Sequence, residues 1–194
     1  MEKGVSAMRA LHAPRVHGLW LLLILALCAP AGAQMAPAVQ PASASTVIVP
    51  GYAIGPWTLD TTVADLAWIL GARTVVLSPD VQFRKEVVVA TWTSPPLVAI
   101  HGPGEDVLQA IGIAAQGYTT REHLGVGARE DQITGAYGRP SLVIQLPSRP
   151  KVLIYNTLGL AFQIAYDVAS GTYGGAERVF VFRPGEAAAI WRVP

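Results

Sequence analysis

Two stretches of this sequence share one pattern, and that pattern constrains the fold more than any other feature. Residues 54–71 (IGPWTLDTTVADLAWILG) and 123–138 (HLGVGAREDQITGAYG) each have a glycine-containing approach, a polar first turn, apolar residues at helical spacing and a terminal glycine. Gly71 and Gly138 are separated by the same 67 positions as Leu66 and Ile133. The pattern predicts two short helices at equivalent places in two repeats.

The first helix is expected to begin at Thr61 or Thr62 and to stop at Gly71. Threonine can cap a helix N-terminus, and Asp65 follows Thr62 by three residues, in the capping-box position. Glycine adopts the left-handed backbone that commonly ends a helix. The residues expected on the apolar stripe of this helix are Val63, Leu66, Ile69 and Leu70.

The second helix is expected from about Ala128 to Gly138, with Ile133, Ala136 and Tyr137 buried. Gly135 in its interior costs about 1 kcal/mol relative to alanine, which favours a short helix. Helices of this length are marginal in isolation. Both must therefore be stabilised by packing their apolar sides on another element.

Runs rich in β-branched residues, separated by short breaks, predict the strands that supply this element. They lie at 74–77, 86–93, 97–101, 107–115, 141–146, 151–156, 158–168, 179–182 and 187–193. Short breaks favour antiparallel pairing, because parallel crossovers need a dozen or more residues. In 158–168 the large residues Leu160, Phe162, Ile164 and Tyr166 alternate with small or polar ones. We expect its bulky face to meet the helices and its other face to be uncovered.

These elements predict an α+β domain over residues 51–194, made of two repeats at about 51–117 and 118–194. Each repeat is a short helix followed by antiparallel strands, and both helices lie on one face of the sheet. With the glycine-led entries (Gly55, then Gly125 and Gly127) and the terminal glycines, this resembles the tandem repeats of secreted bacterial β-lactamase-inhibitory proteins and the related small outer-membrane lipoprotein assembly domains. The resemblance implies the fold and a binding sheet. It implies no functional residue, because those inhibitors carry disulfides in their repeats and no position here matches an inhibitory contact.

Residues 1–33 have the composition of a secretory signal. Three basic residues precede an apolar run over 19–29, and Ala31-Gly32-Ala33 is a small-x-small cleavage site. A retained membrane anchor is the alternative, but this run of 11 residues is shorter than the roughly 20 that cross a bilayer. We therefore expect a secreted or periplasmic protein without a membrane span after cleavage. Residues 34–50, rich in Ala, Pro and Ser, are expected to be a flexible linker, in which 47–49 can form a short edge strand.

Cysteine and charge content exclude several classes of function. Cys28 is the only cysteine and lies in the apolar run, so the exported chain would have no disulfide, no thiol chemistry and no cysteine metal site. We expect folding to need neither oxidation nor a metal or other cofactor. The chain has 14 Lys and Arg and 13 Asp and Glu; three and one of these lie in 1–33, which leaves 11 and 12. Without a basic stripe, nucleic acid is not an expected partner, whereas another envelope or secreted protein is.

The strongest candidate for a catalytic or metal-binding site is 101–106 (HGPGED), where His101, Glu105 and Asp106 could gather around a metal ion or a water. A Pro-Gly turn with solvated polar side chains is the favoured alternative, because metal sites need three or four ligands in defined geometry. His123 is expected in a surface loop. We assign no catalytic and no metal-binding residue.

Carboxylates and aromatic residues supply the remaining candidates. A glycosidase-like carboxylate pair could come from Asp60, Asp65, Glu105, Asp106 or Asp167, but the sequence singles out no pair. The candidate binding residues are Trp92, Tyr155, Tyr166 and Trp191, for which core packing is the alternative.

These observations predict a non-catalytic protein-interaction or envelope-associated module that binds through an open sheet face. Two alternatives remain: a small exported hydrolase whose site assembles only in the fold, and a carrier of an apolar ligand held between helices and sheet. A convergent polar cleft would indicate the enzyme, a closed apolar cavity the carrier, and an exposed aromatic patch the interaction module.

The cleavage site generates a first prediction. The exported form should begin at or near Gln34, because Ala31-Gly32-Ala33 fits signal peptidase. Mass spectrometry of the exported protein checks this, and an intact Met1 or a lipid on Cys28 would contradict it.

Overall fold

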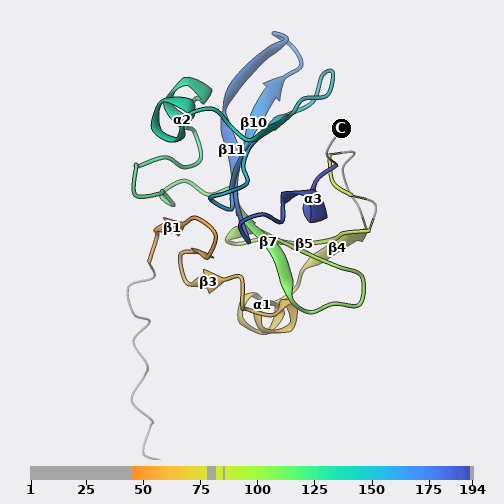
Figure 1. The fold of residues 1–194 in the computed structure, drawn as a ribbon. Coiled ribbons are helices and arrows are strands. Elements are labelled where there is room, and N and C mark those ends of the chain that lie inside the picture. The colour runs from red at the N-terminus through yellow and green to blue at the C-terminus, as the bar shows by residue number, and fades with distance from the viewer. Residues whose placement is uncertain (1–44, 78–81, 85, 193–194) are drawn as a thin grey trace, which may run out of the picture. The chain divides into compact units, whose positions relative to one another are not determined.

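The computed structural model describes residues 45–77, 82–84 and 86–192 (Figure 1). The expected signal at 1–33 and the linker residues 34–44 lie outside the described residues. Those that are described belong to one compact unit, residues 41–194.

The described chain is mostly β-structure, arranged in two antiparallel sheets. A small sheet has the order β1-β2-β3 and a large one the order β4-β5-β6-β7-β11-β10-β9-β8. The strands are β1 (Ile48–Val49), β2 (Ala53–Ile54), β3 (Trp57–Thr58), β4 (Thr74–Leu77), β5 (Val88–Thr93), β6 (Pro96–His101), β7 (Leu108–Ile113), β8 (Leu142–Ile144), β9 (Lys151–Tyr155), β10 (Leu160–Asp167) and β11 (Thr172–Phe182).

Three short helices complete the described structure: α1 (Val63–Leu70), α2 (Glu130–Tyr137) and α3 (Ala187–Ile190). After residue 60 the chain therefore runs through one helix and four strands, then again through one helix and four strands, and ends in α3. The last strand of each set, β7 and β11, pair at the middle of the large sheet, where Ile113 faces Val179 and Ala110 faces Phe182.

The first two helices begin and end as their sequences predict. In α1, Thr62 accepts a hydrogen bond from the backbone N–H of Asp65 at 3.0 Å, and the Asp65 carboxylate accepts one from the N–H of Thr62 at 3.4 Å. In α2, Gln132 accepts a hydrogen bond from the N–H of Arg129 at 2.9 Å. Gly71 and Gly138 end the helices with φ of 78° and 75°, a backbone that favours glycine.

Both faces of the large sheet are covered along its inner strands. On one face lies the helix-side core, to which α1 contributes Val63 and Leu66 and α2 contributes Ile133. On the other face lies a second core, built by strand residues together with Phe83, Val87, Ala187, Ile190 and Trp191. In Figure 1 α3 is seen apart from α1 and α2, consistent with its packing in the second core.

The second core overturns two expectations. Residues 187–193 were expected to be a strand, but 187–190 form α3, because a short apolar run does not distinguish a strand from a buried helix. The far face of β10 was expected to be uncovered, but Ala161 and Gln163 are buried there. Trp191 helps to cover this face, with its ring 5.0 Å from that of Phe182.

The helices also depart in detail from the expected stripes. Ile69 is 59% exposed, although Val63 and Leu66 are buried. At 100° per residue, Ile69 lies about 120° from Val63 around the helix, outside the side that meets the sheet. Ala136 is likewise exposed, and Tyr137 is half-buried.

Residues 45–59 belong to the folded unit rather than to a linker. Ile48 is 1% exposed and joins the helix-side core, and its backbone N–H donates to the carbonyl of Thr119 at 2.7 Å. The alternative of a short strand at 47–49 thus describes this segment better than a spacer does. No helix in the described residues is long and apolar enough to cross a membrane.

The packing of α1 and α2 generates a second prediction. Leu66→Ala and Ile133→Ala should each lower the free energy of unfolding by about 2–5 kcal/mol, because each leaves a cavity in the helix-side core. Urea unfolding measures this. Ile69→Ala, in the same helix as Leu66 but exposed, is the control and should change stability by about 0.5 kcal/mol or less. Equal losses for Leu66→Ala and Ile69→Ala would refute the packing described here.

Candidate functional site

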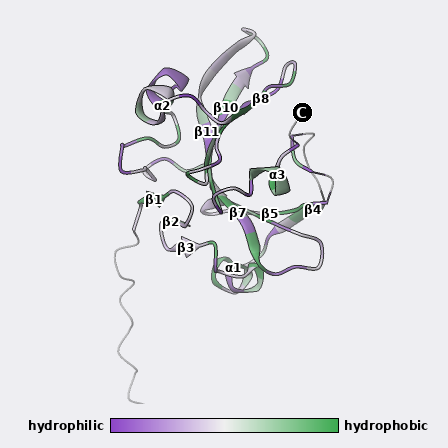
Figure 2. Cartoon of the chain, in the orientation of Figure 1, coloured by the Kyte–Doolittle hydropathy of each residue, from purple (hydrophilic) through white to green (hydrophobic). Residues whose placement is uncertain are grey.

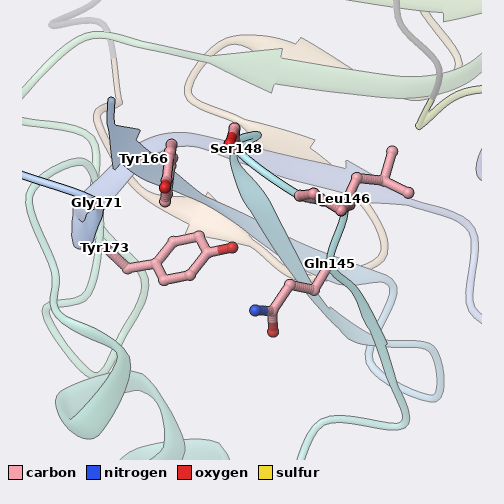
Figure 3. Close-up of a pocket in the computed structure, with 7 residues that line it drawn as sticks. Gln145, Leu146, Ser148, Tyr166, Gly171 and Tyr173 are labelled. Atoms are coloured by element: carbon pink, nitrogen blue, oxygen red, sulfur yellow. The ribbon is translucent and has the colours of Figure 1, made fainter. Parts of the chain in front are cut away.

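A hollow of about 540 Å³ opens beside the edge strand β8. One wall is the loop between β8 and β9, and the other is the hairpin of β10 and β11 (Figure 3). The residues that line it are Gln145, Leu146, Pro147, Ser148, Tyr166, Gly171 and Tyr173. None of these side chains is charged at neutral pH.

Two tyrosines form the aromatic part of this hollow. Tyr166 and Tyr173 are direct partners on β10 and β11, and their rings meet edge to face at 5.2 Å. Beside Tyr173 the ammonium group of Lys151 lies 4.5 Å from the ring centroid and forms an ion pair with Glu130 at the start of α2. The hairpin is thereby tied to α2, and this lysine is already paired.

The other aromatic candidates from the sequence lie in the cores. Trp92 and Tyr155 are 4% and 3% exposed in the helix-side core, and Trp191 is 1% exposed in the second core. Trp92 donates a hydrogen bond to the carbonyl of Gly71, and Tyr155 donates one to that of Gly138, so each is tied to the end of a helix. Only Tyr166, which is half-buried, lines the hollow.

The 101–106 segment forms a turn that supports α1. Asp106 accepts hydrogen bonds from two N–H groups in the first turn of the helix: its carbonyl from Val63 and its carboxylate from Ala64, both at 3.1 Å. His101 contacts the neighbouring carbonyl of Gly102 through Nδ1 at 2.9 Å. Among the described residues, no three His, Cys, Asp or Glu side chains are placed to hold a metal ion.

Other carboxylates from the candidate pool also have structural partners. Asp60 pairs with Arg183 at 3.4 Å, and Asp65 completes the capping box of α1. Asp167 accepts a hydrogen bond from Ser170 at 2.7 Å, which lowers its pKa. Each of these three carboxylates therefore has a structural partner in the fold.

A hydrogen bond joins α2 to the loop before it, where the second copy of the sequence pattern begins. Tyr137 on α2 donates a 2.5 Å hydrogen bond to Glu122, which lowers the pKa of that carboxyl group. Burial and this hydrogen bond raise the pKa of the Tyr137 phenol. The pair therefore stays a neutral donor and a charged acceptor at neutral pH. The exposed His123 lies in the turn that follows Glu122.

A second candidate surface comprises α1 and the strand that follows it, β4, which lies at the opposite end of the large sheet from β8. We call it the β4 surface and define it by its exposed apolar residues: Trp68 (88% exposed), Ile69 (59%), Val75 (51%) and Val76 (42%). Figure 2 shows that α1 is more hydrophobic than α2. At the 67-residue offset, Gly135 and Ala136 of α2 stand in the places of Trp68 and Ile69.

The β4 surface includes the edge of the sheet. Among the described residues, β4 pairs only with β5, so one side of its backbone has no strand partner. Edge strands are usually protected by charge, proline or short length. β8 has three residues, whereas β4 has four with the sequence TVVL, which has no charge and no proline.

The sequence alone did not single out Trp68 or Val75 as candidate surface residues. The available signal was angular: Trp68 lies about 200° around the helix from Leu66, which places a large apolar residue opposite the buried side. No pattern in the sequence indicated that both faces of β4 would be exposed, because this exposure depends on where the sheet ends.

Neither the protein-family models, nor the curated proteins, nor the solved structures contain a match to this chain.

The contacts of Asp106 generate a third prediction. Asp106→Ala should lower the free energy of unfolding by about 1 kcal/mol, the usual effect of losing a helix cap. Glu105→Ala is the matched control and should have a smaller effect, because Glu105 accepts no side-chain hydrogen bond from the described residues. Thermal unfolding with zinc ions and with a chelator extends the test. A melting temperature that rises with zinc only in the wild type would show a metal site instead.

Proposed function

We propose that this protein is an exported, non-catalytic interaction module that binds another secreted or envelope protein through the β4 surface. The observation that carries the proposal is the 88% exposure of Trp68 on α1, the helix that directly precedes a strand with an unpaired edge. Tryptophan is enriched at the energetic centres of protein interfaces, and large exposed apolar residues that gather in one place mark interaction sites.

The partner is inferred to present an extended segment that adds a strand to β4. The free N–H and C=O groups on the edge of β4 supply hydrogen bonds for such a segment, and side chains on both faces supply specificity. Val75 and Val76 point to opposite faces of the strand and are both exposed, so the added strand should be apolar on both sides.

The charge of Arg73 indicates a further property of the partner segment. Arg73 precedes β4, is exposed, and forms no ion pair with the described residues. An acidic residue at the end of the added segment that meets Arg73 would complement it. The proposed partner segment is therefore extended, apolar and acidic at one end.

In this proposal the two halves of the fold are copies of one helix-and-four-strand unit. Support comes from the repeated element order, from the strand order that is symmetric about the β7–β11 pair, and from the terminal glycines of α1 and α2. The proposed relationship to the inhibitory-protein repeats accords with a binding role. The binding surface differs from the open sheet face first expected, because both faces of this sheet carry a core.

The two alternatives have less support. A hydrolase requires carboxylates or histidines that converge, whereas Asp60, Asp65, Asp106 and Asp167 are engaged in ion pairs, caps and turns. An apolar-ligand carrier requires an enclosed apolar cavity, whereas the hollow beside β8 is open and includes polar groups.

The fourth prediction tests the β4 surface by photo-crosslinking. A photoreactive amino acid in place of Trp68 should form a covalent adduct with another protein in cells that produce this chain. Val75→Lys in the same protein should reduce the adduct by about ten-fold or more, because a charge on an edge strand opposes strand addition. Mass spectrometry of the adduct should map it to an extended apolar segment.

The matched control places the photoreactive residue at Val168, which is 76% exposed on the β10–β11 turn. This position should give little adduct. Equal yields at 68 and 168, or adducts only between two copies of this chain, would refute the proposed partner.

A further inference from the structure

The hollow beside β8 has the size of a small-molecule site and lies at the opposite end of the sheet from β4. Its volume of about 540 Å³ falls in the range of roughly 300–1,000 Å³ that is usual for ligand pockets. Two separate segments of the chain form its walls, so it is more than a gap within one loop. From its chemistry we infer that it binds a neutral saccharide.

The first reason is the pair of aromatic rings. Tyr166 and Tyr173 are both half-buried, so part of each ring remains accessible from the hollow. The face of an aromatic ring is electron-rich and attracts weakly positive C–H groups. One side of a pyranose sugar presents such C–H groups, and the edge-to-face arrangement at 5.2 Å offers two differently oriented surfaces to receive them.

The second reason is the set of hydrogen-bonding groups around the rings. The Gln145 amide, the Ser148 hydroxyl and the two phenols can each donate and accept hydrogen bonds. Within the described residues, none of these four side chains makes a hydrogen bond. In Figure 3 the hydroxyl end of Tyr173 points toward the loop that carries Gln145 and Ser148. Sugar hydroxyls, which also donate and accept, match this mixed set.

The third reason is the absence of charge from the lining. Lys151 is held against Tyr173 and paired with Glu130, so it is not available to an anion in the hollow. Arg149, in the same loop as Ser148, is exposed and does not belong to the lining. A phosphate, a sulfate or a carboxylate ligand would normally meet Arg or Lys at its site. The lining therefore favours a neutral ligand over an acidic one.

The fifth prediction is that the full exported protein binds glucose, N-acetylglucosamine, maltose or cellobiose in this hollow. In a two-dimensional amide NMR titration, the shift changes should be confined to the loop at 145–148 and the hairpin at 166–173. Tyr166→Ala and Gln145→Ala should each weaken binding by about ten-fold or more, whereas Tyr166→Phe, which keeps the ring, should weaken it less.

Tyr52→Ala is the matched control, because Tyr52 is a 53% exposed tyrosine in the turn between β1 and β2 and does not line the hollow. It should bind like the wild type, as should Trp68→Ala, which separates this site from the β4 surface. If Tyr166→Ala disturbs the fold, Gln145→Ala and Ser148→Ala test the inference instead, because both residues are exposed. No shift with any of the four sugars, shifts outside the hollow, or stronger binding of inorganic sulfate or of a proline-rich peptide there would overturn the inference.

Discussion

The antiparallel pairing of β7 with β11 is the interaction on which the rest of the structure depends. It joins the four strands that follow α1 to the four that follow α2, and without it each half would expose the strand edge that the other now covers. Its residues also contribute to both cores, with Ile111 and Val181 on the helix side and Ala110 and Phe182 on the other. A non-local pairing of this kind must be stabilised by the apolar surface buried on its two faces.

Gly112 shows how closely this centre is packed. A glycine inside a strand often marks a bulge or bend, but the pairing of Gly112 with Val98 and Phe180 is regular. A side chain at this position would come within 2.6 Å of the Phe180 ring. Glycine is needed here so that the aromatic ring can lie over β7, and the register shift falls instead between Ile100 and His101.

Covering both faces of the sheet leaves its two ends as the places where a partner can bind. One end has the unprotected strand β4, which follows the helix that carries the exposed Trp68, and the other has the tyrosine hollow beside β8. The two ends differ in chemistry although the element order around them is the same. At one end the exposed groups are apolar, which suits an extended protein segment. At the other they are aromatic and polar without charge, which suits a neutral ligand.

Local sequence patterns were sufficient for α1, α2 and eight of the nine expected strands, because capping residues, terminal glycines and β-branched runs act within a few positions. Among the aromatic residues that they singled out, Tyr166 lines the hollow. They were insufficient for α3 and for the roles of Trp92, Tyr155 and Trp191, because the same apolar residues can face a core or a ligand. Which of these occurs was decided by tertiary structure: the C-terminal segment folds over the second face of the sheet, where Trp191 packs against Phe182, and the ends of the strand order leave β4 and the hollow exposed. Burial and exposure depend on contacts between residues far apart in the chain, and no local pattern contains that information.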